Sequence, residues 1–512
     1  MTSRLWRFLP AVLLLFPLGA AGADEPVLDA AAIRQKVREA SGPAQTVWRE
    51  TIVTTSSDGS NVTRLRLQRE SDFRVVSDDG PFHTERGSVK DEAWHENENG
   101  QVVIEQPDPA ESVREPMTTT VSRVHTPVEA FVIATLTGRG TGTKEYVDPA
   151  TWHVVRRESI GPNGTIVTVY DDFRADHGRS FAHHWRVDDG VARTTSESRV
   201  TLYESGTVGD ADVAIPMPRR ALVEFPAGVR SLELPTRFAP FGHIYVRVMA
   251  GDRGLDFILD TGSYGIAMDE QVAKELGITP YAEHSTVTAA RHSIARAIIP
   301  ELRVGGLRMR NVMVHLEPQG WVEQAGVKTV GLLGFDFLAE LGVTIDYEHQ
   351  RVTVVRGEDV RPPADPHTTP LDVRLGSGQP LMTVSVNGAS ADRFMLDTGG
   401  AGTFLILDYF ARRHPEAVRD EGAGARSRPI RFSGIGGAFD VRAYQIKSLK
   451  LANINFSEFV GYRVTSSGSY PGATDGVIAP AFLRLFTVGL DYGNARIYLT
   501  PNTEGRRAMG IK

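Results

Sequence analysis

Phe257-Ile258-Leu259-Asp260-Thr261-Gly262-Ser263 and Phe394-Met395-Leu396-Asp397-Thr398-Gly399-Gly400 are the two stretches of sequence that decide the fold. In each of them an apolar, strand-like run leads directly into Asp-Thr-Gly. The strand would fix the aspartate at its end, while the glycine lets the backbone turn sharply and brings amide N–H groups near the carboxylate. A β-hairpin is predicted ahead of each stretch, turning through residues 251–254 in one case and at Asn387-Gly388 in the other.

A second motif follows each aspartate at a similar distance, which indicates an internal repeat. The first unit continues with GLLGFDFL at residues 331–338, and the second continues with GVIAPAFL at residues 476–483. The two aspartates are 137 residues apart and the two later motifs are 145 residues apart. One Asp-Thr-Gly is weak evidence, but two copies with matching sequels are hard to obtain by chance. The alternative is that both aspartates only shape turns.

Both units resemble the retropepsin-like aspartic proteases, the family of retroviral proteases and their bacterial single-domain relatives. The family pattern is two apolar residues, Asp-Thr/Ser-Gly-Ser/Thr/Ala, a flap hairpin, and then two apolar residues before a glycine. The first unit matches throughout, with Ser263 after its triplet and Leu332-Leu333-Gly334 further on. The second unit departs at Gly400, which lacks a hydroxyl group, and at Ala479, where glycine is usual.

The resemblance implies that Asp260 and Asp397 lie side by side with a water between them. It also implies that Thr261 and Thr398 hydrogen-bond across the interface and hold the two loops rigid. In the family each copy of a dimer supplies one aspartate. Here one chain would supply both, although pairing of two chains, unit to unit, stays open. The residues expected to support the active site are Thr261, Gly262, Ser263, Thr398 and Gly399.

Two carboxyl groups roughly 3 Å apart cannot both ionise easily, so they share one proton and titrate as a pair. The ionised partner would activate the water, and the protonated partner would donate to the peptide carbonyl oxygen. This chemistry needs no metal and no other cofactor. We expect Ser263 to hydrogen-bond Asp260, a bond that Gly400 cannot offer Asp397, which would make Asp397 the more easily protonated member.

A glycine-rich stretch at residues 432–439 is the predicted flap of the second unit, a hairpin that would close over an extended substrate. The corresponding stretch of the first unit, residues 286–297, lacks glycine. Its charges are predicted to be solvated, although they would also suit an acidic substrate; they are Arg291, His292 and Arg296. The residues of the predicted flap tip are Gly434, Ile435, Gly436 and Gly437.

The chain ahead of the repeat predicts an antiparallel sheet with one helix. Residues 29–40 carry Ile33 and Val37 on one face, with Asp29 as the cap, and short alternating runs fill residues 46–203. The segment EYVDPATWHVVRRE at residues 145–158 resembles the periplasmic lipoprotein-carrier fold, a curved sheet closed by helices. That resemblance implies a concave face that holds an apolar ligand. A spacer or docking module is the alternative.

Residues 1–23 are predicted to be a secretion signal. Arg4 and Arg7 precede an apolar run at residues 8–18, and Ala21-Gly22-Ala23 supplies a small-x-small cleavage pattern. The apolar run is too short to span a bilayer comfortably, although an uncleaved anchor is the alternative. The protein is therefore expected in the periplasm or outside the cell.

Composition narrows the possible partners. The 512 residues carry a formal charge of −7 without a concentrated basic block, which argues against nucleic acid as a partner. The absence of cysteine excludes disulfides and thiolate metal sites. No metal site is predicted, because His83 and His95 are isolated and the neighbours His183 and His184 would face opposite sides of a strand. We expect a monomer.

These patterns together predict a mainly β protein, with an N-terminal curved antiparallel sheet and helix followed by two retropepsin-like β-barrel lobes in a bilobal body. The expected boundaries are residues 24–215 for the first domain, 220–358 for the first lobe, 359–368 for a proline-rich linker and 369–505 for the second lobe. The predicted function is that of an exported aspartic endopeptidase acting on proteins or peptides. The alternative, favoured by Gly400 and Ala479, is a non-catalytic periplasmic binding protein or lipid/lipoprotein carrier on a degenerate protease scaffold.

Overall fold

The computed structural model describes most of the chain, and strands dominate it, which confirms the mainly β class. The predicted signal at residues 1–23 lies outside the described residues. None of the described helices is both long and apolar enough to cross a membrane. The described residues are 28–511 without 58, 107–115, 127–128, 139, 162–163, 191–194, 288–290, 318–322, 325, 377, 420–427, 435–436 and 466–473.

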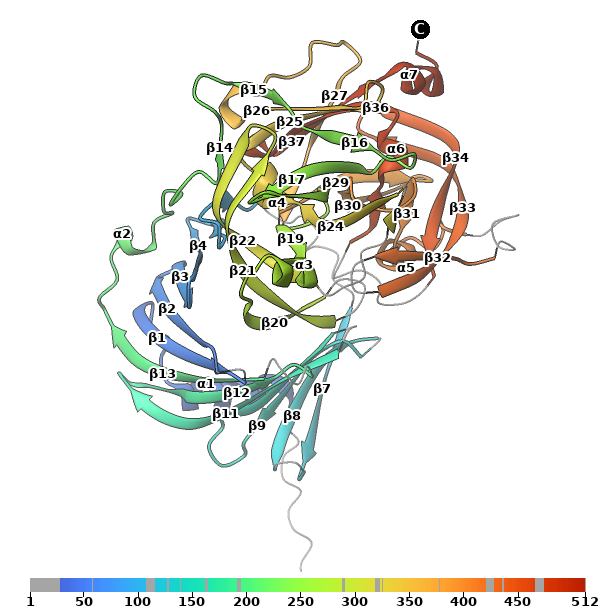
Figure 1. Ribbon diagram of the computed structural model, residues 1–512. Helices are drawn as coiled ribbons and strands as arrows, with labels where there is room; N and C mark the ends of the chain where they lie inside the picture. Colours follow the sequence, from blue (N-terminus) through green and yellow to red (C-terminus); the bar gives the residue numbers. More distant parts are fainter. Residues whose placement is uncertain are drawn as a thin grey trace, which may run out of the picture.

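The N-terminal region forms one antiparallel sheet of 13 strands, which curves like a cradle beneath the rest of the molecule (Figure 1). The strands are β1 (Val47–Ser56), β2 (Asn61–Arg69), β3 (Asp72–Asp79), β4 (Phe82–Val89), β5 (Glu92–Glu96), β6 (Val102–Ile104), β7 (Met117–Val124), β8 (Ala130–Thr137), β9 (Gly142–Val147), β10 (Val154–Gly161), β11 (Gly164–Asp176), β12 (Arg179–Asp188) and β13 (Ser196–Ser205). Their spatial order is β6-β5-β4-β3-β2-β1-β13-β12-β11-β10-β9-β8-β7, so each half of the sheet is a meander and the pair β1–β13 joins the halves.

Helix α1 (Ala30–Ser41) packs on this sheet and begins where the sequence predicts. Asp29 caps it, because its side chain accepts a hydrogen bond of 2.7 Å from the amide of Ala32. Ile33 is fully buried and packs against Ile133 of β8. The helix therefore covers part of one face of the sheet, as the pattern of apolar residues indicates.

The first lobe follows and is built on a ten-stranded sheet. Its main path is β14-β22-β19-β24-β18-β17-β21-β20, and a further pairing of β21 with β22 closes it on itself. The elements up to the end of this lobe are α2 (Asp210–Val213), β14 (Val223–Glu224), β15 (Ser231–Glu233), β16 (Thr236–Phe238), β17 (Ile244–Ala250), β18 (Arg253–Leu259), β19 (Ile266–Asp269), α3 (Glu270–Glu275), β20 (Tyr281–Val287), β21 (Arg291–Val304), β22 (Leu307–Glu317), β23 (Glu323–Gln324), β24 (Val327–Leu333), α4 (Phe335–Leu338), β25 (Leu341–Asp346), β26 (Arg351–Arg356) and η2 (Gly357–Asp359).

The second lobe places like elements in like positions on an eight-stranded sheet, β28-β29-β30-β35-β31-β34-β33-β32. In both lobes a hairpin, β17–β18 or β29–β30, has its second strand parallel to a later one, β24 or β35. The elements are β27 (Thr369–Asp372), β28 (Arg374–Gly376), β29 (Gln379–Val386), β30 (Ala389–Leu396), β31 (Phe404–Ile406), α5 (Asp408–Arg413), β32 (Ile430–Gly434), β33 (Gly437–Leu451), β34 (Ile454–Val464), β35 (Gly476–Ile478), α6 (Pro480–Leu483), β36 (Phe486–Asp491), η4 (Tyr492–Asn494), β37 (Arg496–Pro501) and α7 (Thr503–Met509).

A six-stranded sheet, β15-β26-β25-β36-β37-β27, joins the two lobes. At its centre β25 of the first lobe pairs antiparallel with β36 of the second, and Thr344 lies opposite Gly489. These two residues are 145 positions apart, the same offset as the two later motifs of the sequence. An approximate two-fold axis therefore passes between Thr344 and Gly489, and the paired aspartates belong to lobes related by it.

The turn between β5 and β6 docks the N-terminal sheet onto the first lobe. The side-chain amides of Asn97 and Asn99 donate to the two carboxylate oxygens of Asp336 in α4, each over 2.8 Å. Gln101 donates to the carbonyl oxygen of Asp336 at 2.9 Å and to Glu340 at 3.0 Å. The sheet is thus attached to the helix that forms the second half of the 331–338 motif of the first lobe.

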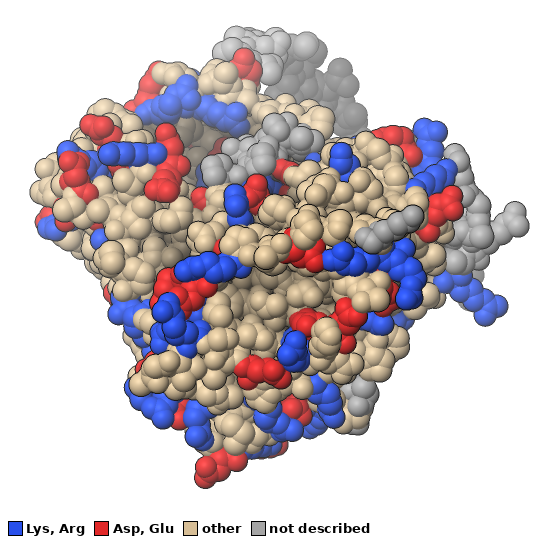
Figure 2. All heavy atoms as spheres, turned by 90° about the horizontal axis from the view of Figure 1, so that it is seen from above, with Lys and Arg blue, Asp and Glu red and all other residues tan. Residues whose placement is uncertain are grey.

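Acidic and basic side chains are interspersed over the described part of the face seen from above in Figure 2. A phosphate backbone requires a concentrated basic surface. The described part of this face does not offer one.

Candidate active site

The two predicted aspartates each stand at the end of a buried strand. Asp260 follows β18, and its amide donates to the carbonyl oxygen of Leu333 in β24 at 3.0 Å. Asp397 follows β30, and its amide donates to Ile478 in β35, also at 3.0 Å. Because both strands lie inside their sheets, the backbone of each aspartate is fixed before its side chain makes any contact.

Both carboxyl groups are buried and accept hydrogen bonds from their own loops. The amide of Gly262 donates to Asp260 Oδ1 at 2.8 Å, and the amide of Gly399 donates to Asp397 Oδ1 at 2.9 Å. The exposed fraction is 9% for Asp260 and 7% for Asp397. The bonds hold each carboxylate oxygen in place, while burial removes water that would otherwise stabilise a charge.

The two carboxyl groups face each other across the lobes, each against the glycine of the other loop. A Cβ atom on Gly262 would lie 2.6 Å from Asp397 Cγ, and a Cβ atom on Gly399 would lie 2.4 Å from Asp260 Cγ. Both contacts are too close for any side chain. The structure therefore brings Asp260 and Asp397 together within one chain, and glycine is required in both loops.

Two threonines lock the loops together beneath the carboxyl groups. The hydroxyl of Thr261 accepts from the amide of Thr398 at 3.0 Å and donates to the carbonyl oxygen of Leu396 at 2.7 Å. The hydroxyl of Thr398 does the same in return, with the amide of Thr261 at 3.0 Å and the carbonyl oxygen of Leu259 at 2.7 Å. Four buried hydrogen bonds thus cross the interface, as the resemblance implies.

Burial raises the pKa of both carboxyl groups, and Asp260 is affected more. The pKa of Asp260 rises well above its usual range through burial first, then through repulsion by Asp397 and a hydrogen bond with it. Burial also raises the pKa of Asp397, but the bond to Asp260, the amides of Gly399 and Gly400 and the charge of His243 lower it. Two buried carboxyl groups in contact share one proton and titrate as a pair.

One hydrogen bond behind the sequence-based expectation is not formed. That expectation rested on a bond from the Ser263 hydroxyl to Asp260, but the hydroxyl donates to the carbonyl oxygen of Gly265 at 3.0 Å. At the corresponding place in the second lobe, a Cβ atom on Gly400 would lie 2.8 Å from Asp397 Oδ2. Gly400 therefore leaves space for the carboxyl group of Asp397. Its lack of a hydroxyl removes no hydrogen bond to the carboxyl group, because Ser263 in the first lobe does not bond Asp260 either.

The departure at Ala479 is absorbed by the neighbouring loop. In the first lobe a Cβ atom on Gly334 would lie 2.4–2.5 Å from carbonyl oxygens of loop 260–265. Loop 397–403 of the second lobe is one residue longer before its next strand begins. There the amide of Ala479 donates to the carbonyl oxygen of Thr403 at 2.9 Å, and the residue is fully buried. The longer loop follows a different path, which leaves space for the methyl group.

The predicted flap stretch of the second lobe ends the hairpin between β32 and β33. Gly434 and Gly437 are its last paired residues, while Ile435 and Gly436 between them lie outside the described residues. The first lobe has the equivalent hairpin β20–β21. The side chains of Arg291 and His292 in that hairpin also lie outside the described part.

Arg296 of β21 is not the solvated loop charge that the sequence indicates. Its side chain is buried, forms ion pairs with Asp79 and, at 3.5 Å, with Glu98, and lies 4.6 Å over the ring of Phe82. Tyr281, opposite Arg296 in the hairpin, meets Phe82 edge to face at 5.5 Å. All three partners of Arg296 belong to the N-terminal sheet or its turns, so this sheet packs against the base of the hairpin.

Sequence reasoning also missed two side chains that cross between the lobes. His243 Nε2 lies 2.8 Å from the carbonyl oxygen of Gly400, and Gln379 Nε2 donates to the carbonyl oxygen of Gly262 at 2.6 Å. The sequence marks them only by position: His243 immediately precedes the first strand of one hairpin, and Gln379 is the first residue of that strand in the other.

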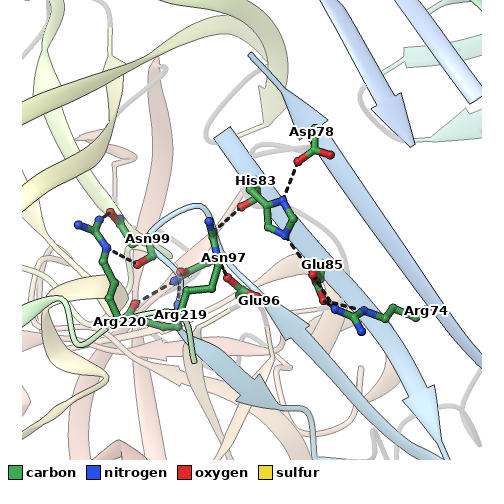
Figure 3. A network of polar contacts seen from close by, with 10 residues as sticks. Arg74, Asp78, His83, Glu85, Glu96, Asn97, Asn99, Arg219 and Arg220 are labelled. Carbon is green, nitrogen blue, oxygen red and sulfur yellow. Dashed lines mark hydrogen bonds and ion pairs between the residues drawn. The ribbon is translucent and has the colours of Figure 1, made fainter. Parts of the chain in front are cut away.

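Three side chains of the N-terminal sheet, His83, Glu85 and Glu96, approach the spacing of a metal site, with ligand atoms within 4.8 Å of one another. Arg74 already binds Glu85 through two hydrogen bonds of 2.8 Å, and Arg219 pairs with Glu96 (Figure 3). The two arginines neutralise the carboxylates that a cation would need. We therefore interpret the group as an ion-pair network beside the docking turn.

A hollow of about 590 Å³ lies on the N-terminal sheet among β1, β10, β11, β12 and β13. Its lining combines Val167, Val169 and Val187 with the charged side chains of Arg156 and Arg186. Such a lining is amphipathic, in contrast to the apolar face that the lipoprotein-carrier resemblance implies.

Residues 246–337 match the aspartyl protease family. The match runs from β17 into α4 and includes Asp260, Gly334 and Asp336. It confirms that the first lobe resembles aspartic proteases. No curated protein matches the chain.

Solved structures resemble both regions at low identity. A protein described as an outer membrane lipoprotein-sorting protein domain, from Vibrio parahaemolyticus, is 10% identical over 35% of this chain and 94% of its own, with a TM-score of 0.26. A LolA superfamily protein from Nitrosomonas europaea is 11% identical over 37% of this chain and 98% of its own, with a TM-score of 0.28. Basic 7S globulin from soybean is 9% identical over 54% of this chain and 96% of its own, with a TM-score of 0.33.

Proposed function

We propose that this protein is an aspartic endopeptidase with one active site, formed by Asp260 and Asp397 of a single chain. One observation carries the proposal: each carboxyl group is seated against the glycine of the other lobe, buried, and in contact with its partner. A protein that only binds gains nothing from two buried carboxyl groups that compete for one proton. An acid–base catalyst needs them.

The proposed reaction uses the two carboxyl groups in different states. Asp397 is ionised and takes a proton from a water between the groups, while the oxygen of that water attacks the peptide carbonyl carbon. Asp260 gives its proton to the carbonyl oxygen, which yields a neutral tetrahedral diol. The proton now on Asp397 passes to the departing amine as the C–N bond breaks, and Asp260 recovers its proton from the hydroxyl.

This division of roles predicts the shape of the pH profile. As the pH falls, Asp397 is protonated and the base is lost; as the pH rises, Asp260 ionises and the acid is lost. The pKa of Asp260 is raised well above its usual range by burial and by repulsion from Asp397. Activity should therefore persist toward neutral pH instead of ending where an ordinary aspartic acid ionises.

We further propose protein or peptide substrates and a periplasmic or extracellular location. The chemistry supports the first, because an acid and a base around one water suit an amide bond. The signal-like pattern of Arg4, Arg7 and the apolar run at residues 8–18 supports the second.

The test is cleavage of a peptide library by the purified protein without its predicted signal. Asp260→Asn and Asp397→Asn should each lose activity by about a thousandfold or more, because the two groups act as one unit. The matched control is Asp269→Asn. Asp269 is also buried and caps α3 by accepting from Val272 at 3.0 Å, and asparagine caps a helix equally well.

Equal cleavage by the native protein and both variants would refute the assignment. A folded native protein that cleaves no peptide over the whole range from about pH 3 to about pH 8 would favour the binding alternative.

A further inference from the structure

One side chain from each lobe reaches the loop that follows the aspartate of the other lobe. His243 lies directly before β17, and its Nε2 is 2.8 Å from the carbonyl oxygen of Gly400. Gln379 opens β29, and its Nε2 donates to the carbonyl oxygen of Gly262 at 2.6 Å. Each aspartate loop is therefore held by the opposite lobe at a second point, beyond the threonine hydrogen bonds.

His243 and Gln379 occupy equivalent positions in the two lobes. Val246, three residues after His243, pairs with Phe257, which lies three residues before Asp260. Met382, three residues after Gln379, pairs in the same way with Phe394, three residues before Asp397. The same place thus holds a titratable imidazole in the first lobe and a neutral amide in the second.

The two side chains differ in the charge that they can carry. A carbonyl oxygen only accepts, so Nε2 of His243 carries a proton, and an imidazole, unlike an amide, can bear a positive charge. Gln379 stays neutral at every pH. The difference falls on one aspartate, because a positive imidazole beside Gly400 lowers the pKa of Asp397.

Two other elements bring charged groups toward His243. Asp397 lies in the loop after β30, and Arg484, at the end of α6, donates to the carbonyl oxygen of Pro240 at 3.0 Å in the turn before His243. His243 is itself buried, so salt screens its interaction with Asp397 only weakly.

We propose that His243 is a positioning residue that makes Asp397 the base of the pair: it holds the loop of Asp397 and, when protonated, keeps the negative charge on that side. Gln379 holds the loop of Asp260 without charge, which leaves the shared proton there. This inference rests on the proposed peptidase function. It explains why two lobes with the same Asp-Thr-Gly divide the roles of acid and base.

The test exchanges the side chains at the two equivalent positions, His243 and Gln379. His243→Gln should keep the fold and KM, and should move the acidic limb of the kcat profile upward by roughly 0.5–1 pH unit, because Asp397 loses a neighbouring positive charge. His243→Ala also loses the hydrogen bond to the loop and should lower kcat about tenfold, a loss that the glutamine variant avoids. Gln379→His places the charge beside Asp260 and should move the basic limb downward.

A second readout does not depend on activity. Titration of the protein carrying ¹³C-carboxyl aspartate, with Asp397 assigned through the loss of its signal in Asp397→Asn, should show a higher midpoint in His243→Gln than in the native protein. An unmoved Asp397 titration and an unmoved acidic limb would overturn the inference while leaving the peptidase proposal intact. Absence of cleavage by the native protein would overturn the peptidase proposal, and the titration would still decide whether His243 controls the charge of Asp397.

Discussion

The two lobes share their strands and their Asp-Thr-Gly triplet, yet they differ at almost every residue that supports the triplet. The parts that are identical are those that touch the paired carboxyl groups or the threonine lock. The parts that differ include the side chains that hold each aspartate loop and those that contact the N-terminal sheet. Positions that correspond but differ are Ser263 and Gly400, Gly334 and Ala479, Asp336 and Ala481, and His243 and Gln379. The lobes thus share a backbone arrangement but differ in the side chains around the shared triplet.

The largest expected effect tests whether the shared part is truly symmetric. Gly262→Ala and Gly399→Ala each place a Cβ atom within 2.6 Å of the opposite aspartate Cγ, so one carboxyl group must move. A displacement on the order of 1 Å lowers kcat/KM by about a hundredfold or more. Gly493→Ala is the matched control, because its nearest contact would be 3.9 Å away. Retained activity in either active-site variant would mean that the carboxyl groups are not seated as described.

The threonine lock should show the same symmetry in stability. Thr261→Val and Thr398→Val each leave a buried amide and a buried carbonyl oxygen without a partner, which should lower the free energy of unfolding by about 2–4 kcal/mol. Denaturant titration measures the loss, and the exposed Thr344→Val should change it little. The double variant should lose less than the sum of the two, because both hydroxyls belong to one network. Additive losses would mean that the two halves of the lock act independently.

Exchanging the residue after each triplet should separate the lobes. Gly400→Ser places a Cβ atom 2.8 Å from Asp397 Oδ2 and should lower kcat about tenfold. Ser263→Gly loses only a hydrogen bond to the carbonyl oxygen of Gly265 and should stay near native activity. Equal effects in both variants would show that the serine hydroxyl supports its carboxyl group after all.

The smallest expected effect concerns Asp336, which the second lobe replaces with Ala481. Burial first, and then the charge of Glu98, raise the pKa of Asp336 to about 7, against the hydrogen bond from Asn99. Because the folded pKa lies above the unfolded one, the contribution of this group is greatest at acidic pH and is lost as the pH rises through about 7. The native protein should therefore lose stability relative to Asp336→Asn as the pH rises from about 4 to about 7. Thermal unfolding of both proteins checks this, and a difference that does not change with pH would contradict it.

The paired motifs were readable from the sequence because each is local. An apolar run before Asp-Thr-Gly predicts a strand, a turn and a carboxylate within seven residues, and the family resemblance implies that the two copies meet. The docking residues Asn97 and Asn99 were not readable, because Asn-Gly in a hairpin turn indicates the turn whether or not the side chain binds a partner over 200 residues away. Arg296 was misjudged for the same reason, since its partner Asp79 lies in another domain of the sequence.

The expected hydrogen bond from Ser263 to Asp260 was wrong, because the sequence does not reveal the other acceptors within reach of the hydroxyl. The hydroxyl instead donates to the carbonyl oxygen of Gly265 in its own loop. The pKa of Asp260 then followed from burial and from its partner, two quantities that only the assembled lobes define. The role of His243 depends on the same assembly, because its acceptor belongs to the other lobe.

The sheet that joins the lobes also has a consequence for synthesis. A ribosome releases β25 about 145 residues before β36, the strand that must pair with it. Until the second lobe folds, the nascent first lobe has an unpaired strand edge, and its aspartate loop lacks the contact with Thr398. The proposed active site therefore forms only after the last strands have emerged, so the nascent chain would have no peptidase activity during synthesis.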